Sequence, residues 1–395
     1  MDISITPGKL SGSISIIPSK SQAHRMLICA AFADKPTTLI CPETNRDIEA
    51  TAACLRALGA EITRSTDGYR VIPAKNVPRK AELPCRDSGS TLRFLLPIVG
   101  ALGVEAVFLP EGRLAQRPLS PLWEQMEEKG CRLTNDGAVI RCEGRLQSGT
   151  FTIAGNVSSQ FITGLLLAAP LMGGAQIEIT GKLESKPYVD MTRKAMALFG
   201  VESEDFRVSA LPYRSPGEVT VEGDWSGGAF FLAANALGSK LDVKNLSADS
   251  PQGDRAAAQL IPALSENITI DCADIPDLVP ILAVVAACKK GAVFTNIRRL
   301  RLKESDRVAS VIAMLTALGG SARADENTLT VFGTGLRGGT ADAVNDHRIA
   351  MSAAIAATAC KEAVTILGAE CTAKSYPQFW AEFARLGGNY EQHLR

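Results

Sequence analysis

The residues best suited to chemistry in this 395-residue chain are an acid and a group of charged neighbours in its second half. Asp277 ends the segment IPD before an apolar run, and LKESDR brings Lys303, Glu304 and Arg307 within six residues. Carboxyl groups can exchange protons, and neighbouring cations can bind anions. The combination is suited to acid–base chemistry on a charged substrate. Because Lys303 and Arg307 are four residues apart, we expect them on one helical face. The alternatives are that Asp277 caps a helix and that LKESDR is a solvated charged turn.

Basic and hydroxyl residues also precede apolar runs in the first half. PSKSQAHR contains Lys20, Ser21 and Arg25, and DSGSTLR contains Gly89 in a small polar segment. The free backbone N–H groups of a helix start attract an anion, and a glycine lets the ligand approach the backbone closely. Either segment could also be an ordinary capped helix with solvated cations.

Further polar residues precede helix-like segments along the chain. Ser158, Ser159 and Gln160 supply three hydrogen-bonding groups where one cap would stabilise the helix, which favours a ligand site. We expect the cations of both halves at helix starts, where they could form one positive pocket for phosphorylated substrates. These cations are Lys20, Arg25, Arg93, Arg117, Lys303, Arg307, Arg348 and Lys374.

The composition excludes several other classes of function. Lys plus Arg and Asp plus Glu each number 42, so no net charge recruits nucleic acid or an acidic membrane. None of the ten cysteines forms a CxxC pair, and no metal-ligand spacing is present, so we expect no metal and no organic cofactor. The amino-terminal segment lacks the pattern of a signal peptide, and no apolar run could span a membrane, so we expect a cytoplasmic protein.

A repeat organises the elements that must position these residues. An amphipathic helix, a small residue and then a strand recur six times, with the small residue at Gly59, Gly130, Gly200, Ser265, Gly319 and Gly387. A glycine there suits a helix end, because it accepts the left-handed conformation that releases the chain. The pattern predicts an α/β fold of six βαβ-type units, three in each of two domains. No GxGxxG segment follows the first strand, so a dinucleotide-binding fold is not supported.

Together these motifs resemble the 5-enolpyruvylshikimate-3-phosphate synthase family over essentially the whole chain. The matching segments occur in the family's order, and they are PSKSQAHR, DSGSTLR, RPL, SSQF, SKPYVDMT, EGDWSGGAFFLAA, QGD, IPD, LKESDR, NDHR and AKSYPQFW. The resemblance implies two inside-out α/β barrels of three βαβαββ units each, with an active site in the cleft between them. The implied division places residues 1–18 and 214–395 in one domain and 19–213 in the other.

The resemblance also implies the reaction. The family transfers the enolpyruvyl group of phosphoenolpyruvate to the 5-hydroxyl of shikimate 3-phosphate through a tetrahedral intermediate, in the shikimate pathway of aromatic amino-acid biosynthesis. Asp277 is implied as the acid/base carboxylate, and Glu304 or Lys20 as the proton donor. We expect a monomer that acts on these two small molecules without a nucleic acid or membrane partner.

The binding residues follow from the same motifs. Shikimate 3-phosphate contacts are implied for Lys20, Ser21, Arg25, Ser158, Ser159, Gln160, Ser185, Asp277 and Lys303. Phosphoenolpyruvate contacts are implied for Lys20, Gly89, Arg117, Gln160, Arg307, Arg348 and Lys374. Departures from common members are Asp87, Phe94 and Arg299. They concern affinity and the response to glyphosate, the inhibitor of this family, rather than the reaction.

Three rival functions predict sequence features that differ from those of this chain. The sister enzyme that loads enolpyruvate onto UDP-N-acetylglucosamine usually has a cysteine in the loop that corresponds to GRLAQRPL, residues 112–119, and this loop has none. A catalytically dead anion-binding protein should have lost Asp277, Glu304 or Lys20, and this chain has all three. An RNA-phosphate-processing enzyme should have an excess of basic residues and a histidine that attacks the nucleotide. Neither feature is evident in this sequence.

Overall fold

The chain divides into two compact units in the computed structural model, which describes residues 1–393. The inserted unit is Pro18–Glu222, and the terminal unit joins Met1–Ile17 to the chain from Gly223 on. The division implied by the family resemblance ends the inserted unit at residue 213, nine residues before the end at Glu222 in the structure. The difference arises because strand β14 (Glu218–Thr220) pairs in parallel with β3 (Thr37–Ile40), which holds residues 218–220 in the inserted unit.

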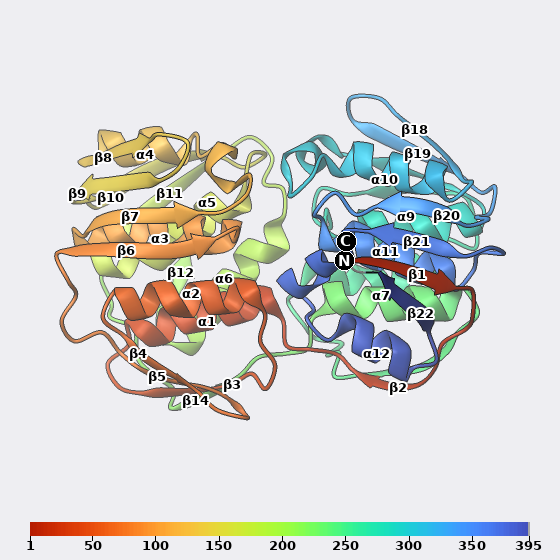
Figure 1. The fold of residues 1–395 in the computed structure, drawn as a ribbon. Coiled ribbons are helices and arrows are strands. Elements are labelled where there is room, and N and C mark those ends of the chain that lie inside the picture. The colour runs from red at the N-terminus through yellow and green to blue at the C-terminus, as the bar shows by residue number, and fades with distance from the viewer. Residues whose placement is uncertain (394–395) are drawn as a thin grey trace. The chain divides into compact units, whose positions relative to one another are not determined.

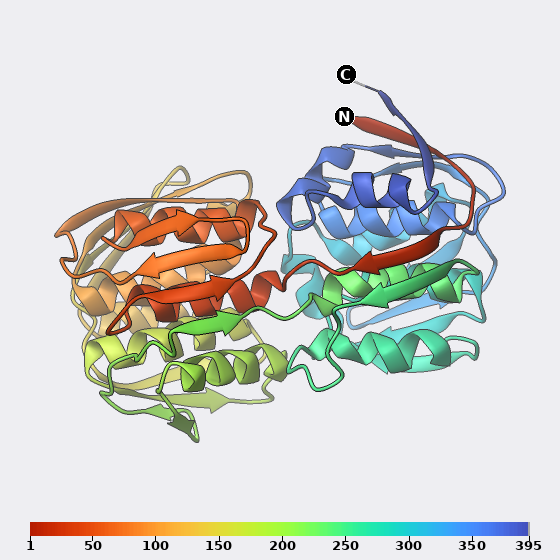
Figure 2. The same cartoon turned by 90° about the horizontal axis from the view of Figure 1, so that it is seen from below.

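Three four-stranded sheets form the inserted unit. The first has the order β14, β3, β5 (Gly68–Ile72), β4 (Glu61–Arg64); the second β6 (Lys80–Arg86), β7 (Glu105–Pro110), β9 (Ile140–Gly144), β8 (Cys131–Asn135); the third β10 (Gly149–Ala154), β11 (Ala175–Thr180), β13 (Arg207–Val208), β12 (Ser203–Glu204). In each sheet the first pair is parallel and the others are antiparallel. That arrangement is the strand pattern of a βαβαββ repeat. Figure 2 shows green β14 beside red β3, although the two are far apart in sequence.

The inserted unit has both interior helices and helices with an exposed face. They are α1 (Lys20–Ala31), α2 (Arg46–Ala57), α3 (Gly89–Leu102), α4 (Leu122–Glu128), α5 (Ser159–Ala168) and α6 (Lys186–Leu198). Helices α1, α3 and α5 are buried along nearly their whole length, and they pack against neighbouring helices. Figure 1 shows β6 and β7 in front of α3. A helix that is apolar on all sides requires such an interior position, so the barrel is inside-out.

The terminal unit repeats this plan in two four-stranded sheets, and its third sheet is a single parallel pair. Its sheets are β20 (Gly339–Asp342), β21 (Val364–Leu367), β1 (Asp2–Thr6), β22 (Asn389–His393); β16 (Ile268–Asp271), β17 (Ala292–Thr295), β19 (Thr328–Phe332), β18 (Ser321–Ala324); and the pair β15 (Lys240–Lys244), β2 (Ser11–Ser15). Its helices are α7 (Trp225–Ala236), α8 (Ala257–Ala263), α9 (Val279–Cys288), α10 (Arg307–Ala317), α11 (His347–Ala357) and α12 (Phe379–Arg385). Helices α7, α9 and α11 are the buried ones and contact one another. The predicted α/β fold of six units, three in each part of the chain, is confirmed.

The glycine markers fall where the repeat predicts them. Helices α2, α4, α6, α10 and α12 are each followed by a marker glycine with φ between 76° and 100°. A side chain is strained in that left-handed region, so these positions favour glycine. Among residues 1–393, no helix has both the length and the apolar character required to cross a membrane.

Candidate active site

Helix α1 begins at the lysine that the sequence singles out. Its N-cap Ser19 makes no side-chain cap bond, and Lys20 Nζ donates to Asp47 Oδ2 over 2.9 Å. Asp47 lies in the first turn of α2 and is only 6% exposed at its side chain. Sequence reasoning missed Asp47, because a partner 27 residues away leaves no local pattern. The ion pair holds the Lys20 ammonium at the start of two neighbouring helices.

Arg25 is buried one turn further along α1 and is held from three sides. Its Nε donates to Thr192 Oγ1 over 2.8 Å, and its Nη2 donates to the backbone oxygen of Tyr188 over 3.0 Å. The Phe94 ring lies 4.9 Å from the Arg25 guanidinium carbon, a cation–π arrangement. Burial lowers the pKa of Arg25 to about 10. Phe94, one of the departures from common family members, is therefore a contact of a predicted binding residue.

A second group assembles around the amino end of α3. Ser88 caps this helix by accepting from Thr91 N. A Cβ placed on Gly89 would lie 2.9 Å from Arg117 Nη1, so the guanidinium group covers the glycine directly. Gln160 Nε2 donates to Ser90 Oγ over 3.0 Å, which ties the start of α5 to the first turn of α3. The structure thus brings together Gly89, Arg117 and Gln160, which the resemblance assigns to phosphoenolpyruvate.

Arg93 completes this group, although it is absent from the residues implied for binding. Its Nη1 donates to Gln160 Oε1 over 2.8 Å, and its Nη2 donates to the backbone oxygen of Pro118 over 3.2 Å. Arg93 therefore connects the Gln160 side chain to the loop that carries Arg117. The sequence shows Arg93 only as one more cation near a helix start.

The serines implied for shikimate 3-phosphate have two different local roles. Ser158 caps α5 by accepting from Gln160 N, and Ser159 follows it as the first residue of that helix. Ser185 precedes α6 in the left-handed conformation, with φ 55° and ψ 36°, and makes no side-chain cap bond. A non-glycine residue held there is strained, and such strain is typical of ligand sites.

Asp277 is the centre of the predicted group in the terminal unit. Its Oδ1 lies 2.5 Å from Arg307 Nη1 and 3.5 Å from Lys303 Nζ. Its Oδ2 accepts from Arg348 Nη2 over 3.1 Å. The N-cap of the following helix α9 is Leu278. The Asp277 side chain is thus paired with three cations, and the interpretation as the N-cap of α9 is wrong.

Arg307 links this carboxylate to two further acids. It is 1% exposed at its side chain, and Nη2 donates to Glu304 Oε2 over 2.7 Å while Nε donates to Asp346 Oδ2 over 2.9 Å. Asp346 also caps α11 by accepting from Arg348 N. Asp346 is not among the predicted site residues. An aspartate just before the helical residues His347 and Arg348 is typical of an N-cap, and this was the signal that could have identified it.

The pKa values of Asp277 and Lys303 are both lowered, for different reasons. Burial alone would raise the pKa of Asp277, but Arg348, Lys303 and Arg307 outweigh it and hold the pKa well below its usual value. Burial lowers the pKa of Lys303 to about 8, against the opposing effect of Asp277. Asp277 is therefore ionised at neutral pH, as a proton acceptor must be.

Two predictions about local placement are wrong. Lys303 and Arg307 do not share a helical face, because Asp306 caps α10 and the helix begins only at Arg307. Not all the cations stand at helix starts either. Arg117 and Lys303 follow the 3-10 turns η1 (Leu114–Gln116) and η4 (Arg298–Leu302), and Lys374 ends η5 (Ala369–Lys374). Short turns of this kind have no apolar periodicity by which the sequence could reveal them.

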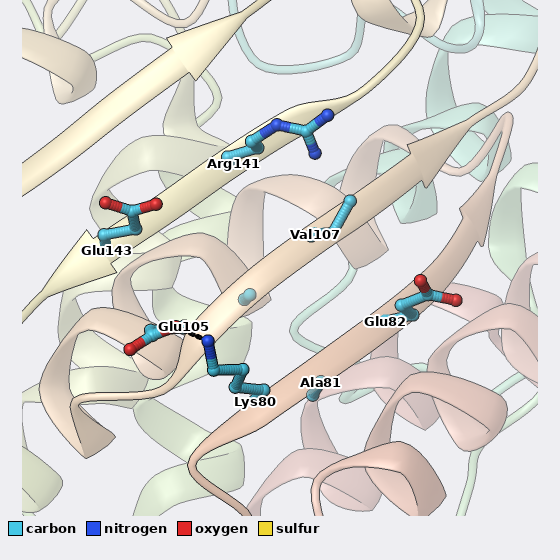
Figure 3. Close-up of a pocket in the computed structure, with 8 residues that line it drawn as sticks. Lys80, Ala81, Glu82, Glu105, Val107, Arg141 and Glu143 are labelled. Carbon is cyan, nitrogen blue, oxygen red and sulfur yellow. Dashed lines mark ion pairs between the residues drawn. The ribbon is translucent and has the colours of Figure 1, made fainter.

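A hollow elsewhere on the inserted unit contains none of the predicted site residues. Figure 3 shows its charged side chains standing on β6, β7 and β9, with Lys80 paired to Glu105. The Nζ–Oε2 distance of that pair is 2.7 Å, and both side chains are more than half exposed. A solvated ion pair on a sheet surface contributes little and suggests no chemistry.

Known proteins resemble this chain along nearly its whole length. A sequence model of EPSP synthase (3-phosphoshikimate 1-carboxyvinyltransferase) matches residues 5–383. A protein of Clostridium beijerinckii named 3-phosphoshikimate 1-carboxyvinyltransferase is 37% identical, covering 99% of this chain and 98% of that protein. One of the same name from Clostridium acetobutylicum is 38% identical with the same coverage.

Solved structures support the fold. EPSP synthase from Acinetobacter baumannii superimposes with a TM-score of 0.77 at 22% identity, covering 99% of this chain and 100% of that chain. At this identity the likeness concerns the fold alone, and it agrees with the six repeated units described above. From the sequence match along nearly its whole length, the chain belongs to the EPSP synthase (3-phosphoshikimate 1-carboxyvinyltransferase) family.

Proposed function

We propose that this chain transfers the enolpyruvyl group of phosphoenolpyruvate to the 5-hydroxyl of shikimate 3-phosphate and releases phosphate. The observation that carries the proposal is the ionised Asp277 among Lys303, Arg307 and Arg348, with Glu304 on the same Arg307. Family membership supports the same reaction. The residues that the resemblance assigns to the two substrates are found in both units.

Asp277 is the general base in this proposal. It accepts the proton of the 5-hydroxyl while that oxygen bonds to C2 of phosphoenolpyruvate, and an acid protonates C3. Loss of a proton from C3 and of phosphate from C2 then restores the double bond. Glu304 and Lys20 are the two candidates for the C3 acid. The surrounding cations hold the carboxylate and phosphate charges of the adduct.

The pairing of Asp277 with three cations suggests how it becomes a stronger base when substrate binds. Three cations compensate its charge, so its proton affinity is low in the structure. Bound anions would share Arg307 and Arg348 with it, and a nearby negative charge raises the pKa of a carboxyl group. Substrate binding thereby couples anion recognition to proton acceptance.

We assign the remaining contacts as the resemblance implies. Shikimate 3-phosphate would contact Lys20, Ser21, Arg25, Ser158, Ser159, Gln160, Ser185, Asp277 and Lys303. Phosphoenolpyruvate would contact Lys20, Gly89, Arg117, Gln160, Arg307, Arg348 and Lys374. Gln160 is bonded to Ser90, the residue after Gly89 in the first turn of α3, which supports a shared role.

Phosphate release with phosphoenolpyruvate tests the proposal. Shikimate 3-phosphate and UDP-N-acetylglucosamine are compared as acceptors under the same conditions. Release with shikimate 3-phosphate alone supports the proposed reaction, whereas release with only the nucleotide sugar assigns the chain to the sister activity. Absence of release with both contradicts enolpyruvyl transfer.

We also propose that the protein acts as a monomer in the cytoplasm, where both metabolites would be available. A single chain carries both groups of predicted site residues, so no second copy is required. Light scattering coupled to size-exclusion chromatography measures the mass in solution, and cell fractionation measures the compartment.

A further inference from the structure

A continuous chain of buried side chains connects helices α1, α2 and α3 in the inserted unit. His24 Nδ1 lies 2.6 Å from Thr51 Oγ1, and Thr51 Oγ1 lies 2.7 Å from Thr91 Oγ1. Thr91 Oγ1 then donates to Ser88 Oγ over 2.8 Å. All four residues are fully buried. The chain ends at Ser88, the N-cap next to Gly89.

The protons of this chain can have only one direction. A hydroxyl group has one proton to donate. Thr91 gives its proton to Ser88, so Thr51 must donate to Thr91. The Thr51 oxygen must therefore accept from His24, which requires a proton on Nδ1 of that imidazole.

His24 is consequently a neutral imidazole with its free lone pair on Nε2. Burial, followed by the charges of Lys20 and Arg25, lowers the His24 pKa well below its usual value. Nε2 is buried and has no hydrogen-bond partner among residues 1–393. The ring of Phe94 packs edge-on against the imidazole, with 6.2 Å between the ring centroids. Donation to Thr51 is thus the contact that defines the tautomer.

The same two helices are joined one turn earlier by the predicted catalytic lysine. Lys20 and His24 are four residues apart on α1, and their partners Asp47 and Thr51 are four residues apart on α2. Side chains at this spacing lie above one another on a helix face. Two parallel connections therefore fix the register of α1 against α2, and the second continues to α3.

We propose that His24 and Thr51 are positioning residues, which hold the Lys20 end of α1 and the Gly89 end of α3 in register for phosphoenolpyruvate. The inference rests on the proposed function for the identity of the ligand. Neither residue needs to touch the substrate. The role differs from simple packing because it depends on a directed series of donors and acceptors.

Kinetics of a threonine series test the role. Thr51→Val keeps the shape but removes the hydroxyl, whereas Thr51→Ser keeps it. Thr37→Val is the matched control, because Thr37 is a fully buried threonine whose 2.7 Å bond to Ser215 lies outside this chain. We expect Thr51→Val to raise the KM for phosphoenolpyruvate on the order of tenfold, and more than the KM for shikimate 3-phosphate.

Thr51→Ser should recover most of the affinity for phosphoenolpyruvate. Thr37→Val should have KM values for both substrates near those of the parent. Equal effects of Thr51→Val and Thr37→Val, or equal impairment in Thr51→Ser and Thr51→Val, would overturn the proposal. A parent that shows no activity with shikimate 3-phosphate would instead contradict the proposed function.

Magnetic resonance of the imidazole tests the chain independently of activity. The protein has only three histidines, so histidine labelled with nitrogen-15 gives few signals, and the His24→Asn variant identifies one of them. Long-range proton–nitrogen correlations distinguish the two neutral tautomers and the imidazolium. We expect neutral His24 with its proton on Nδ1 at neutral pH. An Nε2–H tautomer or an imidazolium would overturn the inference even if Thr51→Val fails to fold.

Discussion

Arg307 Nη1 donates to Asp277 Oδ1 over 2.5 Å, so a guanidinium group binds the proposed base directly. The same guanidinium also contacts Glu304 and Asp346. Replacing or displacing Arg307 would deprive Asp277, Glu304 and Asp346 of a cation that compensates their charges. The site therefore depends on the competition between substrate anions and protein carboxylates for Arg307.

Asp277→Asn should retain the fold and bind shikimate 3-phosphate while it loses turnover. The amide is nearly isosteric but cannot take the proton of the 5-hydroxyl, and such a loss typically lowers the rate by about 10²–10⁴-fold. Steady-state phosphate release gives kcat, and isothermal titration gives the dissociation constant. Asp325→Asn is the control, since Asp325 lies on an exposed turn of the same unit. Near-parental turnover of Asp277→Asn would remove Asp277 from the acid–base role.

Lys303 should limit the use of shikimate 3-phosphate at alkaline pH. Burial lowers its pKa to about 8, so the protonated fraction of the free enzyme falls as pH rises through that value. The kcat/KM for shikimate 3-phosphate reports the free enzyme and should fall about tenfold per pH unit above this point. Lys303→Arg keeps its charge throughout the range. Its profile should stay flat there, and a parallel fall in both proteins would assign the limb to another group.

The repeated fold could be predicted because its signal is local. A helix that ends in a left-handed residue favours glycine wherever it occurs, and the five marker glycines have that conformation. The missing glycine at Ser265 did not hide its repeat, since α8 still precedes β16. The boundary between the units was less predictable, because the pairing of β14 with β3 joins segments about 180 residues apart.

The partners of the site residues could be predicted only in part. Cations and serines in motifs were visible, whereas Asp47, Thr192 and Asp346 act through contacts with residues far away in sequence. The helix expected across Lys303 and Arg307 failed for a local reason. Asp306 is a strong N-cap, and its preference for helix starts outweighed the charge pattern.

Gly89→Ala should weaken phosphoenolpyruvate binding without unfolding the protein. The new methyl group would lie 2.9 Å from Arg117 Nη1 and 3.3 Å from Arg93 Nη1, so both flexible guanidinium ends must move. We expect the KM for phosphoenolpyruvate to rise on the order of tenfold while the melting temperature stays close to that of the parent. Gly8→Ala is the matched control, because no atom lies within 4 Å of its added methyl group. Equal KM values in the two variants would contradict the contact between Gly89 and Arg117.

Asp254 should make the protein less stable as pH rises. Burial, followed by the charge of Asp277, raises the pKa of this carboxyl group to about 7, against the opposing effects of Arg348 and Ser226. The pKa of an aspartate in an unfolded chain is about 3.9. Between these values the folded state keeps a proton that the unfolded state loses, so the free energy of unfolding falls as pH rises.

Asp254→Asn mimics the protonated group and removes this dependence. The melting temperature of the variant minus that of the parent should therefore increase between pH 4 and pH 8, on the order of 3 °C or more. Other titrating groups occur in both proteins and cancel in the difference. Ser226 Oγ donates to Asp254 Oδ2, and that bond lowers the carboxyl pKa. Ser226→Ala should consequently steepen the loss of stability in the parent but not in Asp254→Asn. A temperature difference that is constant with pH, measured by differential scanning calorimetry, would show that Asp254 does not titrate in this range.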